Sequence, residues 1–121
     1  ARDDDPDSFD YDVTRAHLEI LSAAADARGR SLEVHVLPAP TRLRPDYLND
    51  EFSAGYVNFY VCNGAVIAPE FGDPETDAHA ESTLAELFPD REIVMLNIDP
   101  LAAGGGGIHC VTQQQPREGA R

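Results

Sequence analysis

Residues 56–69 read YVNFYVCNGAVIAP, and this stretch decides the fold of the chain. Two β-prone runs, residues 56–62 and 65–68, flank the dipeptide Asn63-Gly64. Because Asn and Gly both tolerate positive φ, this dipeptide between two such runs strongly indicates a β-hairpin. Pro69 is expected to end the second strand, since proline cannot donate to a sheet ladder.

One helix and one strand are expected after the hairpin. Residues 76–88 carry apolar side chains at helical spacing, among them Ala80, Leu84 and Phe88. Residues 91–98 read REIVMLNI, which is β-prone. The sequence therefore predicts the order strand–strand–helix–strand, a ββαβ module, and an α/β fold.

The preceding residues predict part of a second module. Apolar residues recur at near-helical spacing over residues 13–28, and residues 32–37 alternate as a strand that Pro38 stops. This helix–strand pair matches the later one at an offset of roughly sixty residues, so the chain is expected to hold one and a half to two modules. The strand at residues 32–37 would then have an unpaired edge.

Length and composition indicate one small domain that is a piece of a larger fold. We expect an acidic connector over residues 1–12, the modules over residues 13–116 and a polar tail over residues 117–121. A total of 121 residues is too short for two domains. The chain starts with Ala, and its first module lacks a hairpin, so the remaining modules are expected in an N-terminal part of the same protein.

The charge balance restricts the partners of the chain. There are 22 acidic and 9 basic residues, with a formal net charge of −13, which repels nucleic acid and anionic membranes. The charge is compatible with a small cationic substrate, although a solvated acidic surface is its simpler explanation. Cys62 and Cys110 are too few for a disulfide scaffold. We therefore expect a cytoplasmic protein with reduced thiols, and neither metal nor cofactor.

Cys110 is the candidate nucleophile. It follows the glycines at residues 104–107 inside residues 108–112, IHCVT, which are expected to form a strand. Four glycines are often a linker, but beside a strand they also let a ligand approach closely. A cysteine in an apolar strand is often buried and inert, whereas one after a glycine loop can be open to substrate and, given a base or a positive charge, reactive.

The partner of Cys110 is not evident from the sequence. In a strand, neighbouring side chains point to opposite faces, so His109 should face away from the sulfur of Cys110. We therefore expect His109 to be structural, with a ring nitrogen hydrogen-bonded to backbone. Cys62, beside the hairpin turn, is expected to be structural as well.

Three motifs resemble the agmatine deiminase and bacterial peptidylarginine deiminase family. Residues 104–116, GGGGIHCVTQQQP, resemble its C-terminal signature, residues 56–73 its hairpin, and residues 87–92, LFPDRE, its next landmark. A common family form has Asn in place of Gly107. The resemblance implies a pentein fold, a five-bladed α/β propeller of ββαβ modules, of which this chain would be the C-terminal part.

The resemblance also implies a reaction. The Cys110 thiolate would attack a guanidinium carbon and release ammonia, and water would resolve the thiouronium intermediate to a ureido product, with Gly106 and Gly107 contacting the substrate. Agmatine, giving N-carbamoylputrescine, is the expected substrate, and free or peptidyl arginine the alternative.

Part of the family's catalytic machinery is not present in the chain. The family's Gly-His-x-Asp stretch, with its catalytic His and acidic residues, is absent here, so the chain alone is expected to be inactive. A truncated binding or regulatory fragment remains the non-enzymatic alternative. Expected partners are the other modules of the same enzyme, or a second copy of the chain.

Overall fold

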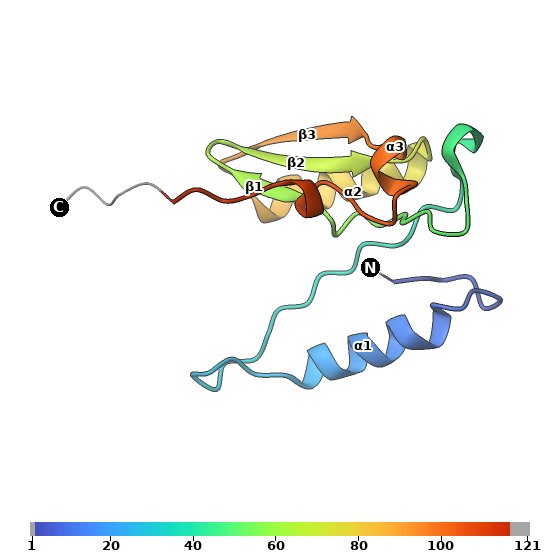
Figure 1. The fold of residues 1–121 in the computed structure, drawn as a ribbon. Helices are drawn as coiled ribbons and strands as arrows, with labels where there is room; N and C mark the ends of the chain where they lie inside the picture. Colours follow the sequence, from blue (N-terminus) through green and yellow to red (C-terminus); the bar gives the residue numbers. More distant parts are fainter. Residues whose placement is uncertain (1, 117–121) are drawn as a thin grey trace.

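The computed structural model describes residues 2–116, which form an α/β unit with a separate N-terminal helix (Figure 1). The predicted polar tail, residues 117–121, lies outside the described residues. The elements follow in the order α1 (Tyr11–Ala23), a 3₁₀ turn at Pro45–Tyr47, β1 (Tyr60–Cys62), β2 (Ala65–Glu70), α2 (Pro74–Leu87), β3 (Glu92–Asn97), α3 (Asp99–Ala102) and a second 3₁₀ turn at His109–Val111.

The predicted hairpin is confirmed, with a shorter first strand and with a second strand that continues through Pro69 to Glu70, so the end expected at Pro69 is wrong. β1 pairs antiparallel with β2, with Cys62 opposite Ala65, and Gly64 in the turn has φ +79°. β1 begins at Tyr60 rather than at Tyr56. The Tyr56 side chain is fully buried and its hydroxyl donates to the Asp77 carboxylate at 2.7 Å, so burial places this β-prone residue in a turn.

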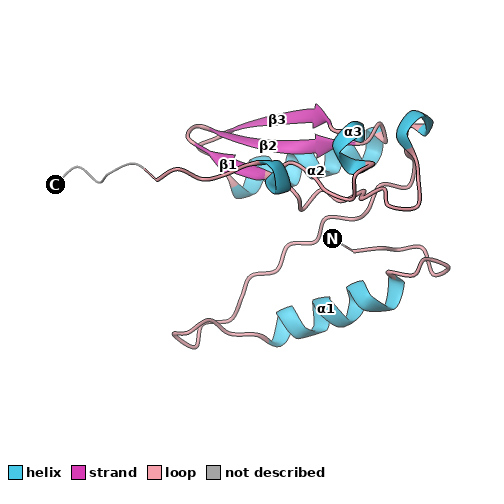
Figure 2. Ribbon diagram, viewed as in Figure 1, coloured by secondary structure: helices cyan, strands magenta, loops and turns pink. Residues whose placement is uncertain are grey.

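The strand–strand–helix–strand order is confirmed for residues 60–97. β2 is the central strand and pairs parallel with β3, with Val66 opposite Ile93. The helix α2 connects these two strands and covers one face of the three-stranded mixed sheet (Figure 2). Leu84 of α2 packs there with the buried Val66 and Ala68 of β2. Residues 60–97 therefore form a ββαβ unit.

The N-terminal segment departs from the prediction. α1 ends at Ala23 rather than at residue 28, because Ala24 is extended and the Asp26 carboxylate accepts the backbone N–H groups of Arg28 and Arg30. Such side-chain to backbone bonds stabilise a turn in place of a helix. α1 also begins at Tyr11, inside the expected connector.

The strand expected at residues 32–37 is wrong. This segment pairs with no other strand. On either side of it, the described residues form two isolated bridges, Ala25 to Ser31 and Arg2 to Pro38. Within residues 2–116 no neighbouring strand is available to pair with it, so its alternating pattern produces no sheet.

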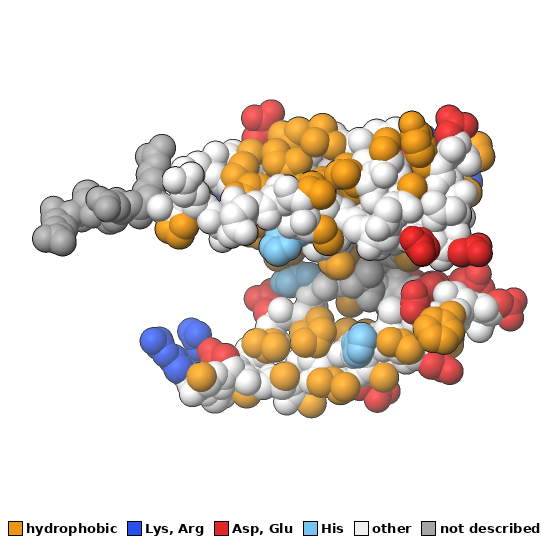
Figure 3. All heavy atoms as spheres, viewed as in Figure 1, with side chains coloured by type: hydrophobic (Ala, Val, Ile, Leu, Met, Phe, Trp, Pro, Cys, Tyr) orange, Lys and Arg blue, Asp and Glu red, His pale blue; other side chains and the backbone are white. Residues whose placement is uncertain are grey.

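The apolar face of α1 remains exposed. None of its residues is buried, and Ile20 is 65% and the preceding Phe9 92% exposed. Figure 3 shows apolar side chains along this helix. An isolated helix of this length is marginal in water, so α1 depends on packing for its stability.

Two buried carboxylates attach the loop at residues 41–44 to the module. Asp73, at the N-terminus of α2, accepts the N–H groups of Thr41 and Arg42 and the Thr41 hydroxyl, at 2.8 to 3.1 Å. Arg44 donates to Asp99 of α3, with Nε 2.6 Å from Oδ2 and Nη2 3.1 Å from Oδ1. These bonds join the loop to the N-termini of α2 and α3.

Asp73→Asn is expected to lower the free energy of unfolding at pH 7 by about 2 kcal/mol, because a buried charged acceptor is lost. The Thr41 hydroxyl, and then the backbone amides, hold the pKa of Asp73 well below its ordinary value. The folded-state pKa is thus below the unfolded one. The stabilisation is therefore complete above the unfolded pKa of about 4 and is lost as the pH falls through the folded value.

Urea unfolding of both proteins between pH 7 and pH 3 measures this effect. The difference in stability should narrow below about pH 4, whereas Asp90→Asn, at an exposed position, should show a small difference at every pH. A difference for Asp73→Asn that stays constant down to pH 3 would contradict the assigned role of the carboxylate.

Candidate active site

The glycine run forms an ordered turn at the end of α3. The N–H groups of Gly104 and Gly105 donate to the carbonyls of Leu101 and Ala102, and Gly105 has φ +76°, a conformation that favours glycine. The loop at residues 49–53 contacts the same turn. Ser53 N–H donates to Ala102 and the Asn49 amide to Ala103, both at 3.0 Å.

Cys110 lies in a 3₁₀ turn, so the strand expected at residues 108–112 is wrong. Its N–H donates to the Gly107 carbonyl at 3.1 Å, and Ile108 is buried in the core with α-helical φ and ψ. Successive residues of a 3₁₀ helix are about 120° apart. His109 and Cys110 therefore do not point to opposite faces, and the strand argument for the orientation of His109 does not hold.

The side chain in contact with the Cys110 sulfur is Asn58. Its Nδ2 lies 3.3 Å and its Oδ1 3.8 Å from Sγ, and Oδ1 accepts the backbone N–H of His109 at 2.9 Å. The sequence pattern alone does not single out Asn58. Its one local signal is an asparagine within a β-prone run, a residue type that strands disfavour.

The surroundings of Cys110 favour its ionised form. Its thiol is exposed, and its pKa is lowered chiefly by the hydrogen bond from Asn58 and also by the backbone of Gly107. A lower thiol pKa gives more thiolate, which is the reactive nucleophile. The expected bond between the His109 ring and backbone is not found among residues 2–116, where His109 bonds through its N–H and carbonyl groups.

Gly106 and Gly107 have different neighbours. A Cβ atom on Gly106 would be 3.6 Å from the Cys110 sulfur, so this glycine borders the thiol directly. A Cβ atom on Gly107, which is buried, would be 2.5 Å from Asn58 Cγ, closer than real contacts permit. Gly107 thus leaves room for Asn58. Substrate contact by either glycine stays a prediction.

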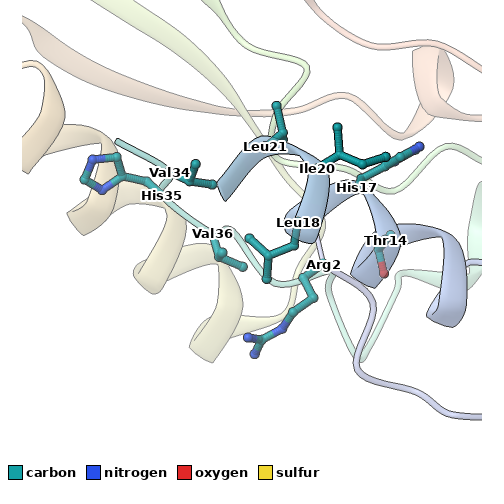
Figure 4. Close-up of a pocket in the computed structure, with 9 residues that line it drawn as sticks. All are labelled: Arg2, Thr14, His17, Leu18, Ile20, Leu21, Val34, His35 and Val36. Carbon is teal, nitrogen blue, oxygen red and sulfur yellow. The ribbon is translucent and has the colours of Figure 1, made fainter. Parts of the chain in front are cut away.

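Two cavities lie elsewhere in the described residues. One of about 300 Å³ lies between α1 and residues 34–36 (Figure 4). Its walls carry His17 and His35, and the His35 ring pairs with the exposed Glu33. A second, of about 650 Å³, borders Cys62, Arg91 and residues 113–116. Cys110 lines neither cavity.

Over residues 2–116 no three His, Cys, Asp or Glu side chains gather closely enough to hold a metal ion. In the same range, no helix combines the length and the apolar character that crossing a membrane requires.

The chain matches a known protein family and several of its relatives. The family model for Porphyromonas-type peptidyl-arginine deiminase matches residues 1–116. An agmatine deiminase of Pseudomonas fluorescens strain Pf-5 is 41% identical over 93% of this chain and 35% of its own. A Streptomyces coelicolor protein, provisionally named an agmatine deiminase, is 47% identical over 93% of this chain and 33% of its own.

The solved structure of an agmatine deiminase of Enterococcus faecalis superposes with a TM-score of 0.82 at 32% identity, covering 94% of this chain and 35% of that one. These likenesses define the class, that of the α/β deiminases. Within that class, the chain belongs to the Porphyromonas-type peptidyl-arginine deiminase family, which confirms the resemblance seen in its motifs. The chain spans about a third of the length of the curated relatives that it matches.

Proposed function

We propose that the complete protein that carries this sequence is a cytoplasmic agmatine deiminase with Cys110 as its nucleophile. The observation that carries the proposal is the exposed Cys110 thiol, which an ordered glycine turn presents and the Asn58 amide contacts. The relatives named agmatine deiminase, at 41% identity and below, supply the reaction and the substrate.

The proposed reaction has two steps. In the first, the thiolate forms a bond to the guanidinium carbon of agmatine, and the C–N bond to one terminal nitrogen breaks to release ammonia. In the second, water adds to the same carbon and the C–S bond breaks, giving N-carbamoylputrescine and free thiolate. The departing ammonia needs a proton and the attacking water must lose one, so a general acid–base is required beside the thiol.

That acid–base group is proposed to come from the rest of the enzyme. Within residues 2–116 the hydrogen bonds of the Cys110 sulfur are with Asn58, and neither a carboxylate nor a histidine ring bonds to it. The exposed apolar side chains of α1, such as Ile20, support packing of this chain against further modules. The five-bladed propeller that the resemblance implies would supply such modules.

A second candidate is hydrolysis of the guanidinium group of free or peptidyl arginine. The description of the matching family favours it, since that family is named for peptidyl-arginine. The chemistry at Cys110 is the same for both substrates. The choice depends on the pocket for the far end of the substrate, which is proposed to lie in the other modules.

The complete enzyme is expected to turn over agmatine, and the 121-residue chain at equal concentration to show none, since it lacks an acid–base partner for Cys110. Ureido product is measured with agmatine, arginine and an arginine peptide side by side. Faster turnover of arginine or of the peptide would favour the second candidate. Equal turnover per Cys110 by the short chain would show that a full site lies within it.

A further inference from the structure

We propose that Asn58 is the positioning residue of the candidate nucleophile: its amide stabilises the Cys110 sulfur as a thiolate and fixes the turn that presents it. The catalytic part of this inference rests on the proposed function, in which Cys110 is the nucleophile. Its test measures the thiol itself, so it can fail or succeed separately from agmatine turnover.

The two ends of the Asn58 amide have separate partners. Oδ1 accepts the His109 N–H at 2.9 Å, and a backbone N–H can only donate, which fixes that end as the oxygen. The NH₂ end then faces the Cys110 sulfur, with Nδ2 at 3.3 Å. A thiolate is an acceptor and fits this donor. A neutral thiol accepts only weakly from Nδ2, and its own S–H faces Oδ1 at the longer distance of 3.8 Å.

The structure holds Asn58 in this orientation from two sides. Its backbone N–H donates to the Gly55 carbonyl, between the buried Tyr56 and the start of β1. On the other side its Cγ packs against Gly107, where a Cβ atom would be 2.5 Å away. An amide oriented in advance interacts with the thiolate without first having to reorganise.

A purely structural role for Asn58 makes a different prediction. If Asn58 only braced the turn, any side chain that keeps the acceptor for His109 N–H would suffice. Asn58→Asp keeps that acceptor at nearly the same size and replaces the donor with a second, negatively charged oxygen. A carboxylate beside Cys110 disfavours the thiolate through its charge alone, so the uncharged Asn58→Ala decides: it removes the amide donor, and the thiol pKa should rise if the amide acts on the sulfur.

The experiment is done on the 121-residue chain with Cys62→Ser, so that Cys110 is the single thiol. The rate of alkylation by iodoacetamide is followed by mass spectrometry from pH 5 to pH 10, and the midpoint of the rise gives the thiol pKa. Asn58→Asp is expected to move this midpoint upward by at least about one pH unit, and Asn58→Ala upward by less. Alkylation at pH 7 should fall about tenfold for Asn58→Asp.

The matched control is Asn63→Asp, which adds the same charge at an exposed position in the hairpin turn. Its midpoint should equal that of the parent. Circular dichroism and the urea midpoint check that each variant folds. If Asn58→Ala does not fold, Gly107→Ala decides: it adds no charge but displaces the Asn58 side chain, and should also raise the midpoint. An unchanged midpoint in a folded Asn58→Ala or Gly107→Ala chain overturns the proposal.

In the complete enzyme, Asn58→Asp is expected to lower kcat/KM at pH 7 and to move its acid limb to higher pH, with KM nearly unchanged. The two proposals can therefore fail separately. An active Cys110→Ser enzyme would overturn the role of Cys110, and a thiol pKa that does not respond to Asn58 would overturn only the role of Asn58.

Discussion

Cys110→Ser in the complete enzyme is expected to lower the rate of ureido product formation at least about a thousandfold, which is the scale of losing a covalent nucleophile. A serine hydroxyl in the same place has a far higher pKa than a thiol, and the Asn58 amide cannot ionise it at neutral pH. The measurement is the initial rate of N-carbamoylputrescine formation at saturating agmatine. Mass spectrometry of the trapped protein should also show the thiouronium adduct in the parent and none in the variant.

The matched control for this substitution is Cys62→Ser. The Cys62 sulfur lies in the hairpin and contacts the Ala65 carbonyl at 3.4 Å, so its loss should leave turnover within about twofold and affect stability slightly. A Cys110→Ser enzyme that folds and retains parental turnover would remove Cys110 from the mechanism. An equal loss of turnover in both variants would point to damage to the fold instead.

Arg44→Met is expected to lower the free energy of unfolding by about 3 kcal/mol, because it leaves the Asp99 carboxylate buried without its partner. Asp99 is 2% exposed, and Arg44 donates to both of its oxygens and also to the Glu70 carbonyl at 2.7 Å. Methionine keeps much of the apolar stem of arginine, so the effect comes mainly from the lost bonds. Urea denaturation at pH 7 measures it.

Arg42→Met controls for the removal of a positive charge from the same loop. The Arg42 side chain is exposed and its bond to Asp73 is made by its backbone N–H, which methionine retains, so the loss should be below about 0.5 kcal/mol. Adding Asp99→Asn to Arg44→Met should restore part of the stability, since no buried charge then lacks a partner. Equal losses for Arg44→Met and Arg42→Met would show that the buried pair is not the cause.

The module could be predicted from the sequence because its signals are local. Asn63-Gly64 fixes the hairpin turn, and the apolar spacing around Ala80 and Leu84 identifies α2. The parallel pairing of β2 with β3 follows once a helix separates them. These elements lie next to one another in both sequence and space, so no distant contact had to be known.

The predictions from the sequence were wrong where contacts between residues far apart in the sequence decide the structure. Residues 108–112 have strand-like composition, but Asn58 accepts the His109 N–H and a 3₁₀ turn results. Residues 32–37 alternate like a strand, and without a neighbouring strand among the described residues they form none. The contact between Asn58 and Cys110 spans 52 positions, which a reading of nearby residues could not reveal.

That separation of 52 positions also bears on the order of folding. The hairpin and α2 contain short-range contacts and can form early, whereas the Asn58–Cys110 contact closes a loop that includes the entire module. The entropy lost in closing this loop is offset only by contacts that form after β2, α2 and β3 have assembled. We therefore expect the Asn58–Cys110 contact, and with it the lowered pKa of Cys110, to form late, so that a partly folded chain carries an ordinary, less ionised cysteine.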